Sequence, residues 1–153
     1  MASLKNASND TYININLQNI DESPKWIGYD LIVFIKENEF LSELLSMYNT
    51  GGLYFENEFT PEVPDIYNSL NLLVNGDISQ YLFEPIDEKD FCLEINRIKD
   101  TSGDYFKVQL FMDKPKIRSR PGIQMYSTAK DLTNFSNELR KEYEELMSEF
   151  KQK

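Results

Sequence analysis

The sequence contains no histidine and a single cysteine, Cys92, in 153 residues. Without histidine, neither a Ser-His-Asp triad nor a Cys-His pair can form, and the commonest transition-metal ligand is missing. One cysteine cannot build an intramolecular disulfide, which is typical of proteins from a reducing compartment. These absences predict a chain that is not an enzyme and that holds no metal or cofactor.

Glycine is also scarce, and Gly51 and Gly52 stand apart from any phosphate-binding spacing. Neither G-x-G-x-x-G nor the lysine pattern of a P-loop is present, so nucleotide binding has no support. The longest apolar run, residues 31–35, is far too short to span a bilayer. Residues 1–10 lack the apolar stretch of a signal peptide. We therefore expect a cytoplasmic protein that does not bind membranes.

Basic residues are outnumbered by acidic ones, 16 against 26, which leaves a net charge of −10. This balance disfavours binding to nucleic acid or to an anionic membrane, because both require positive charge to meet phosphate. It would suit a basic protein partner, and it is also an ordinary property of soluble domains. Hydrophobic residues make up 41% of the chain, with 10 Phe and 9 Tyr, which indicates a folded domain with a core.

Alternating apolar and polar residues predict half-buried strands at residues 12–17, 90–98 and 105–112. The polar residues 99–104 join the last two strands as a β-hairpin. Residues 28–36 are apolar on both faces, which favours a more central strand, although a short buried helix would give the same pattern. Shorter strands are expected at residues 53–59, 81–84 and 122–126.

Helical spacing of apolar residues predicts helices at residues 39–48, 65–74 and 128–150. The last is the longest, and its apolar positions recur every three or four residues. Thr128 is its expected N-cap, with Asp131 placed for a capping box. A helix with one apolar stripe requires a partner surface, because it is not stable alone.

Strands in runs with few helices between them indicate an α+β fold. We expect a single, mostly antiparallel, twisted sheet with the long C-terminal helix packed on one face and the shorter helices at the edge. Residues 1–10 are polar and predict a disordered or frayed N-terminus. Residues 11–153 are expected to form a single α+β domain.

An acidic turn follows the predicted strand at residues 81–84. It could bind a divalent cation or act as an acid–base pair, but its spacing fits no EF-hand loop. A solvated turn that protects a sheet edge would account for it equally well. The same carboxylates could also mimic phosphates toward a basic partner. The residues concerned are Glu84, Asp87, Glu88 and Asp90.

Trp26 is a candidate anchor for a protein partner, because Trp is favoured at protein interfaces. It could also be an ordinary residue of a core or sheet. One basic run fits either a contact for an acidic spot on a partner or a solvated loop. That run consists of Lys114, Lys116, Arg118 and Arg120.

The C-terminal half of the sequence resembles small bacterial immunity proteins of polymorphic toxin systems, in particular the WapI-like group. The resemblance covers about the last 75 residues, and the first 80 match only in outline. Its residues are Phe83-Glu84-Pro85, Phe91-Cys92-Leu93-Glu94-Ile95, Val108-Gln109-Leu110 and the helix with Asp131-Leu132, Phe135 and Leu139. It implies a cytoplasmic, non-enzymatic inhibitor that blocks a cognate toxin, often a basic nuclease. It supplies no fixed interface positions.

Our first hypothesis is therefore an immunity protein that binds a protein partner, possibly a basic toxin domain, and no nucleic acid. The second is a small-ligand-binding or regulatory domain with a pocket between sheet and helices. A third, an enzyme that uses only carboxylates and tyrosines, is disfavoured by the missing histidine. For the first hypothesis the expected partner-binding residues are Trp26, Glu84, Asp87, Glu88 and Asp90.

Overall fold

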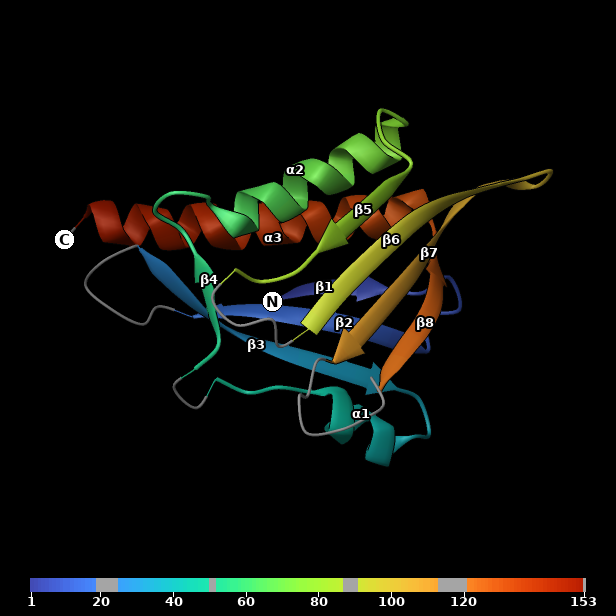
Figure 1. Ribbon diagram of the computed structural model, residues 1–153, viewed down its shortest axis with the longest axis horizontal. Coiled ribbons are helices and arrows are strands. Elements are labelled where there is room, and N and C mark those ends of the chain that lie inside the picture. Colours follow the sequence, from blue (N-terminus) through green and yellow to red (C-terminus); the bar gives the residue numbers. More distant parts are fainter. Residues whose placement is uncertain (19–24, 50–51, 87–90, 113–120, 153) are drawn as a thin grey trace.

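The computed structural model describes residues 1–18, 25–49, 52–86, 91–112 and 121–152. These form two four-stranded antiparallel sheets and three helices, which confirms the α+β fold class (Figure 1). The first sheet contains β1 (Ala2–Lys5), β2 (Thr11–Gln18), β3 (Trp26–Ile35) and β4 (Tyr54–Glu56), in that order. The second contains β5 (Gln80–Phe83), β6 (Phe91–Asp100), β7 (Gly103–Met112) and β8 (Gly122–Ser127).

The strands divide into two sheets, whereas the sequence pattern predicts a single one. Between β4 and β5 the chain forms α2 (Glu62–Asn75), which packs against both strands. The next strand therefore begins a new sheet instead of extending the first. Alternation of apolar residues shows which side chains face the core, but not which strands form hydrogen bonds with each other. That choice depends on contacts distant in the sequence.

The inner faces of the two sheets share one core. Tyr29 and Phe55 of the first sheet stack with ring centroids 4.0 Å apart. Phe91 and Phe83 of the second sheet contact these rings edge-on, at 5.9 Å in each case. Such aromatic pairs contribute somewhat more than the area they bury. The buried apolar side chains of both sheets belong to a single cluster.

The prediction of a frayed N-terminus is wrong. Ala2 and Leu4 are completely buried, and β1 pairs with β2 as an edge strand of the first sheet. The backbone N–H of Ser3 donates to the Glu138 carboxylate, at 2.8 Å. A side chain of the C-terminal helix thus satisfies one backbone N–H of an edge strand, a group that could otherwise pair with another chain. With only two core-facing residues, β1 is too short to show a detectable alternation.

Helix α3 (Ala129–Lys151) begins as predicted. Thr128 and Asp131 form both hydrogen bonds of a capping box. The helix packs against β1 and α2, and its three fully buried apolar residues are Leu132, Phe135 and Leu139. Among the residues described, no helix combines the length and apolar character needed to cross a membrane.

Strand β3 lies inside the first sheet, as its apolar pattern predicts, although β4 pairs only with its first three residues. Further along that edge, Leu53 and Met47 form backbone hydrogen bonds with β3, and helix α1 (Glu39–Leu45) with Ser46 covers its end. The hydroxyl oxygens of Ser42 and Ser46 each accept a backbone N–H of β3, both at 2.9 Å. The helix lies on the opposite side of the molecule from α2 and α3 (Figure 1).

Candidate functional site

The structure places two of the five predicted partner-binding residues. Trp26 is the first residue of β3, pairs with Glu56 of β4, and has 39% of its surface exposed. Glu84 directly follows β5 and is half-buried. The other three, and the basic run, lie outside the described residues: Asp87, Glu88 and Asp90, and residues 114–120.

The segments that carry Trp26 and Glu84 are connected by one buried carboxylate, that of Glu62 in the first turn of α2. Its Oε2 accepts the backbone N–H of Glu56, the cross-strand neighbour of Trp26, at 2.7 Å. Its Oε1 accepts the backbone N–H of Ile86, two residues after Glu84, at 2.6 Å. Glu62 is only 3% exposed. The start of α2 therefore fixes the end of β4 and the first residues of the acidic turn together.

The buried position of Glu62 makes ionisation of its carboxyl group unfavourable. Desolvation raises the pKa of its carboxyl above the ordinary value, and the nearby carboxylates of Glu56 and Asp65 act in the same direction. The two backbone N–H groups lower it, but by less. Ionising Glu62 is therefore less favourable than ionising an ordinary glutamate.

A second buried carboxylate, that of Glu56, organises the loop between β4 and α2. It accepts the backbone N–H groups of Glu58, Phe59 and Thr60 at 2.7, 2.7 and 2.6 Å. Burial alone would raise the pKa of Glu56, but these three donors together leave it below its ordinary value. The ionised form of Glu56 thus holds three consecutive residues of the loop in place.

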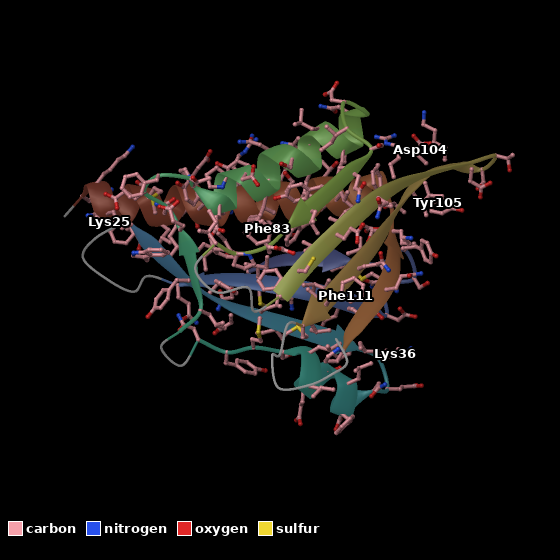
Figure 2. The ribbon with its side chains drawn as sticks, in the orientation of Figure 1. Lys25, Lys36, Phe83, Asp104, Tyr105 and Phe111 are labelled. Carbon is pink, nitrogen blue, oxygen red and sulfur yellow. The ribbon has the colours of Figure 1, made fainter. Side chains whose placement is uncertain are left out.

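The loop held in this way presents an aromatic side chain to solvent. Phe59 is 86% exposed, the largest exposed fraction of any large apolar residue that the structure describes. Its neighbour Glu58 forms an ion pair with Lys25, at 3.3 Å, next to Trp26. Lys25 marks this end of the molecule, opposite Asp104 and Tyr105 at the β6–β7 hairpin (Figure 2).

Asn57 links the same loop to α3. Its backbone N–H donates to the Lys25 carbonyl at 2.8 Å, and its Oδ1 accepts the Tyr143 hydroxyl at 2.8 Å. Its side-chain amide donates to the sulfur of Met147 at 3.4 Å. The loop from residue 57 to 61 is therefore bonded on one side to the start of β3 and on the other to the C-terminal half of α3.

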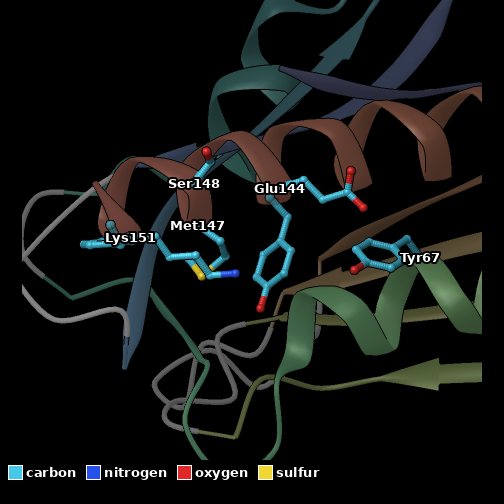
Figure 3. Close-up of a pocket in the computed structure, with 7 residues that line it drawn as sticks. Tyr67, Glu144, Met147, Ser148 and Lys151 are labelled. Carbon is cyan, nitrogen blue, oxygen red and sulfur yellow. The ribbon is translucent and has the colours of Figure 1, made fainter. Parts of the chain in front are cut away.

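An open groove of about 680 Å³ lies between α2 and the C-terminal half of α3 (Figure 3). The Tyr67 and Tyr143 rings meet edge-on in it, with centroids 6.1 Å apart. Tyr67 and Glu144 lie near one end and Lys151 near the other (Figure 3). Arg140 lies over the Tyr67 ring, 5.0 Å from its centroid. The groove thus combines an aromatic wall with charges of both signs.

The described part of the chain contains no group of three or more His, Cys, Asp or Glu side chains that could hold a metal ion. The two buried carboxylates, Glu56 and Glu62, use both of their oxygens to accept backbone N–H groups. The observed role of these two carboxylates is structural: they hold the backbone of the loop that follows β4 and of the residues that follow β5. The loop that Glu56 fixes exposes the side chain of Phe59, and Glu62 fixes the backbone at Ile86, where the described part of the acidic turn ends.

Sequence reasoning missed Glu56, Asn57, Phe59 and Glu62. The available signal was Pro61 followed by acidic residues, which is typical of a helix start and would have moved the beginning of α2 from residue 65 to 62. The burial of Glu56 has no counterpart in the sequence, because acidic residues are rarely buried.

A comparison of this chain with models of known protein families and with curated proteins found no match. No residue role therefore comes from a relative.

Proposed function

We propose that the protein is a non-catalytic binding domain, and more specifically an immunity protein that neutralises a toxin domain in the cytoplasm. The observation that carries the proposal is the double hydrogen bond of Glu62 to the backbones of Glu56 and Ile86. These bonds hold the Trp26 strand pair and the beginning of the acidic turn together. Trp26 and the acidic turn are each predicted from residue type alone to contact a partner, and the two predictions are independent.

Three further features support a protein partner. Trp26, Phe59 and Ile86 are exposed at or next to these fixed segments, and aromatic anchors dominate the energetics of many interfaces. The net charge of −10 would speed the encounter with a basic partner through electrostatic steering. The resemblance of the C-terminal half to WapI-like immunity proteins adds a specific class of partner, a toxin domain.

Co-expression with the product of the adjacent upstream gene tests this function. We expect that product to be toxic alone, and this chain to rescue growth by forming a stable complex with it. A harmless neighbour, or a toxic one that neither binds this chain nor is neutralised by it, would contradict the proposal.

The acidic turn has its own test. Reversing four charges to Lys, with folding checked by circular dichroism, should weaken the complex without unfolding the domain. Unchanged affinity in that variant would remove the turn from the interface while leaving the function in place. The four residues are Glu84, Asp87, Glu88 and Asp90.

The groove between α2 and α3 favours a second candidate function, small-ligand binding. Tyr67 is only 8% exposed, yet its hydroxyl points toward the space below Glu144 (Figure 3). Volume alone does not distinguish this groove, because a hollow of about 720 Å³ lies beside Tyr105 and Tyr126. A thermal-shift screen of metabolites tests the idea. Stabilisation that is lost in Tyr143→Leu, with no protein partner bound, would favour it over the immunity function.

A further inference from the structure

The negative charge of the chain comes entirely from its central part. Residues 37–88 contain 11 acidic residues and no Lys or Arg. The rest of the chain carries 15 acidic and 16 basic residues and is therefore close to neutral. The central part includes α1, β4, the loop of residues 57–61, α2 and β5. Because α1 lies on the opposite side of the molecule from α2, these charges do not form one surface (Figure 1). A partner that meets the side formed by the loop of residues 57–61 and α2 would gain from positive charge, since Glu58 and Asp65 are exposed there.

Phe59 lies within this acidic segment. Its side chain is exposed, but its backbone is fixed by hydrogen bonds, unlike that of an ordinary surface loop. Its own N–H and those of Glu58 and Thr60 are bound by one carboxylate, that of Glu56. Asn57 fixes the start of the loop to α3 through Tyr143. Ordering a loop on binding normally weakens an interface, and this loop is already ordered before any partner arrives. An exposed phenyl ring on a fixed loop contributes nothing to the hydrophobic core of this chain.

We propose that Phe59 is the central anchor of the partner interface, and that it enters an apolar pocket bordered by Lys and Arg on a basic protein. This inference rests on the proposed protein-binding function and specifies its contact. The basic border follows from charge. Glu58 and Asp65 are exposed on either side of Phe59 in the chain, and the only cation paired with either in the described structure is Lys25. Trp26, on the neighbouring strand, lies at the margin of the contact.

The test compares two exposed phenylalanines of the same acidic segment. Phe40 is 77% exposed and belongs to α1, a helix on the opposite side of the molecule from α2 (Figure 1). With the adjacent gene product as the probe, Phe59→Ala should weaken binding by about 30-fold or more, the range of an interface hot spot. Phe40→Ala should change the affinity less than about threefold. Neither variant should alter the unfolding midpoint.

A second variant tests the role of the fixed loop without changing the ring. Glu56→Gln replaces an ionised acceptor, so the N–H groups at 58–60 lose charge-assisted bonds. We expect a loss of affinity of about tenfold, while the isolated domain stays folded as judged by circular dichroism.

The variant Glu58→Lys tests the role of charge. It should slow association with the basic partner and reduce the dependence of the association rate on salt.

The outcomes separate the two proposals. If the wild-type chain binds the neighbouring product and Phe59→Ala binds as tightly, the anchor is wrong and the protein-binding function stands. Equal losses in Phe59→Ala and Phe40→Ala would likewise overturn the anchor. If the wild-type chain does not bind the product at all, the proposed function fails, and this inference fails with it.

Discussion

The guanidinium of Arg97, on β6, donates a hydrogen bond to the backbone carbonyl of Val74 at the end of α2, at 2.7 Å. It also donates to the Leu73 carbonyl and to the Asp104 carboxylate. Helix α2 has no basic residue in its last turn, and carbonyls at a helix C-terminus favour a cation. A strand of the second sheet therefore supplies the charge that the helix itself lacks.

Replacing Arg97 should weaken the contact between α2 and the second sheet. We expect Arg97→Ala to lower the free energy of unfolding by about 2–3 kcal/mol, because two carbonyls at the end of α2 lose a charged donor. Arg97→Lys should lose less, since an ammonium keeps the charge without the planar fork. Urea denaturation measures both variants. A loss below about 0.5 kcal/mol in the Ala variant would show that the contact does not stabilise the fold.

Glu56 should make stability fall in acid. Its folded-state pKa lies below the ordinary value of 4.5, so the unfolded chain binds more protons between the two values. The stability it contributes is therefore complete above about pH 4.5 and is lost as the pH falls through the folded pKa. Glu56→Gln should remove this part of the acid dependence. Urea denaturation of both proteins between about pH 3 and 6, the range in which carboxyl groups titrate, measures the difference.

Glu62 should have the opposite effect on the pH dependence of stability. Burial and nearby carboxylates raise its folded-state pKa above 4.5, so the folded protein binds more protons between the two values. Its contribution is most favourable below about pH 4.5 and declines as the pH rises through the folded pKa. Relative to Glu62→Gln, the wild-type protein should thus become less stable over this interval. A parallel pH dependence of the two proteins would contradict the assignment.

Gly122, at the start of β8, lies so close to the backbone of β7 that there is no room for a side chain. A Cβ atom there would lie 2.3 Å from the carbonyl oxygen of Leu110 and 3.0 Å from the Phe111 ring. We expect Gly122→Ala to destabilise the protein by about 1–3 kcal/mol, as overpacking does elsewhere. Gly52→Ala is the matched control, because its added Cβ would have no described atom within 4 Å apart from those of its chain neighbours. Thermal unfolding of the two variants should differ accordingly, and similar midpoints would exclude the close approach as the reason.

Much of the secondary structure could be predicted from local patterns. The strands at β2, β6 and β7 and the start of α3 follow from side-chain periods of two and 3.6 residues, together with the Thr128–Asp131 capping box. Strand β1 could not be predicted, because Ala2 and Leu4 are isolated apolar residues in a polar stretch. Its stability depends on pairing with β2 and on Glu138, which is 135 residues away from Ser3.

The candidate site was predictable only in part. Trp26 and the acidic turn could be selected from residue type. Residues 87–90 of that turn lie outside the described structure. Phe59 and the carboxylates of Glu56 and Glu62 gave no such signal. A buried glutamate looks the same in the sequence as an exposed one, because the difference lies in which backbone N–H groups the fold brings to it.

The sequence by itself determined the α+β class, the positions of most elements and the acidity of the central segment. These properties depend on residue type and on spacing along the chain, which are local. Only the tertiary structure decided that the strands form two sheets, that β1 is an edge strand of the first, and that Glu62 joins the end of β4 to Ile86. Hydrogen-bond partners across the fold depend on the simultaneous placement of distant segments, and no local pattern encodes that placement.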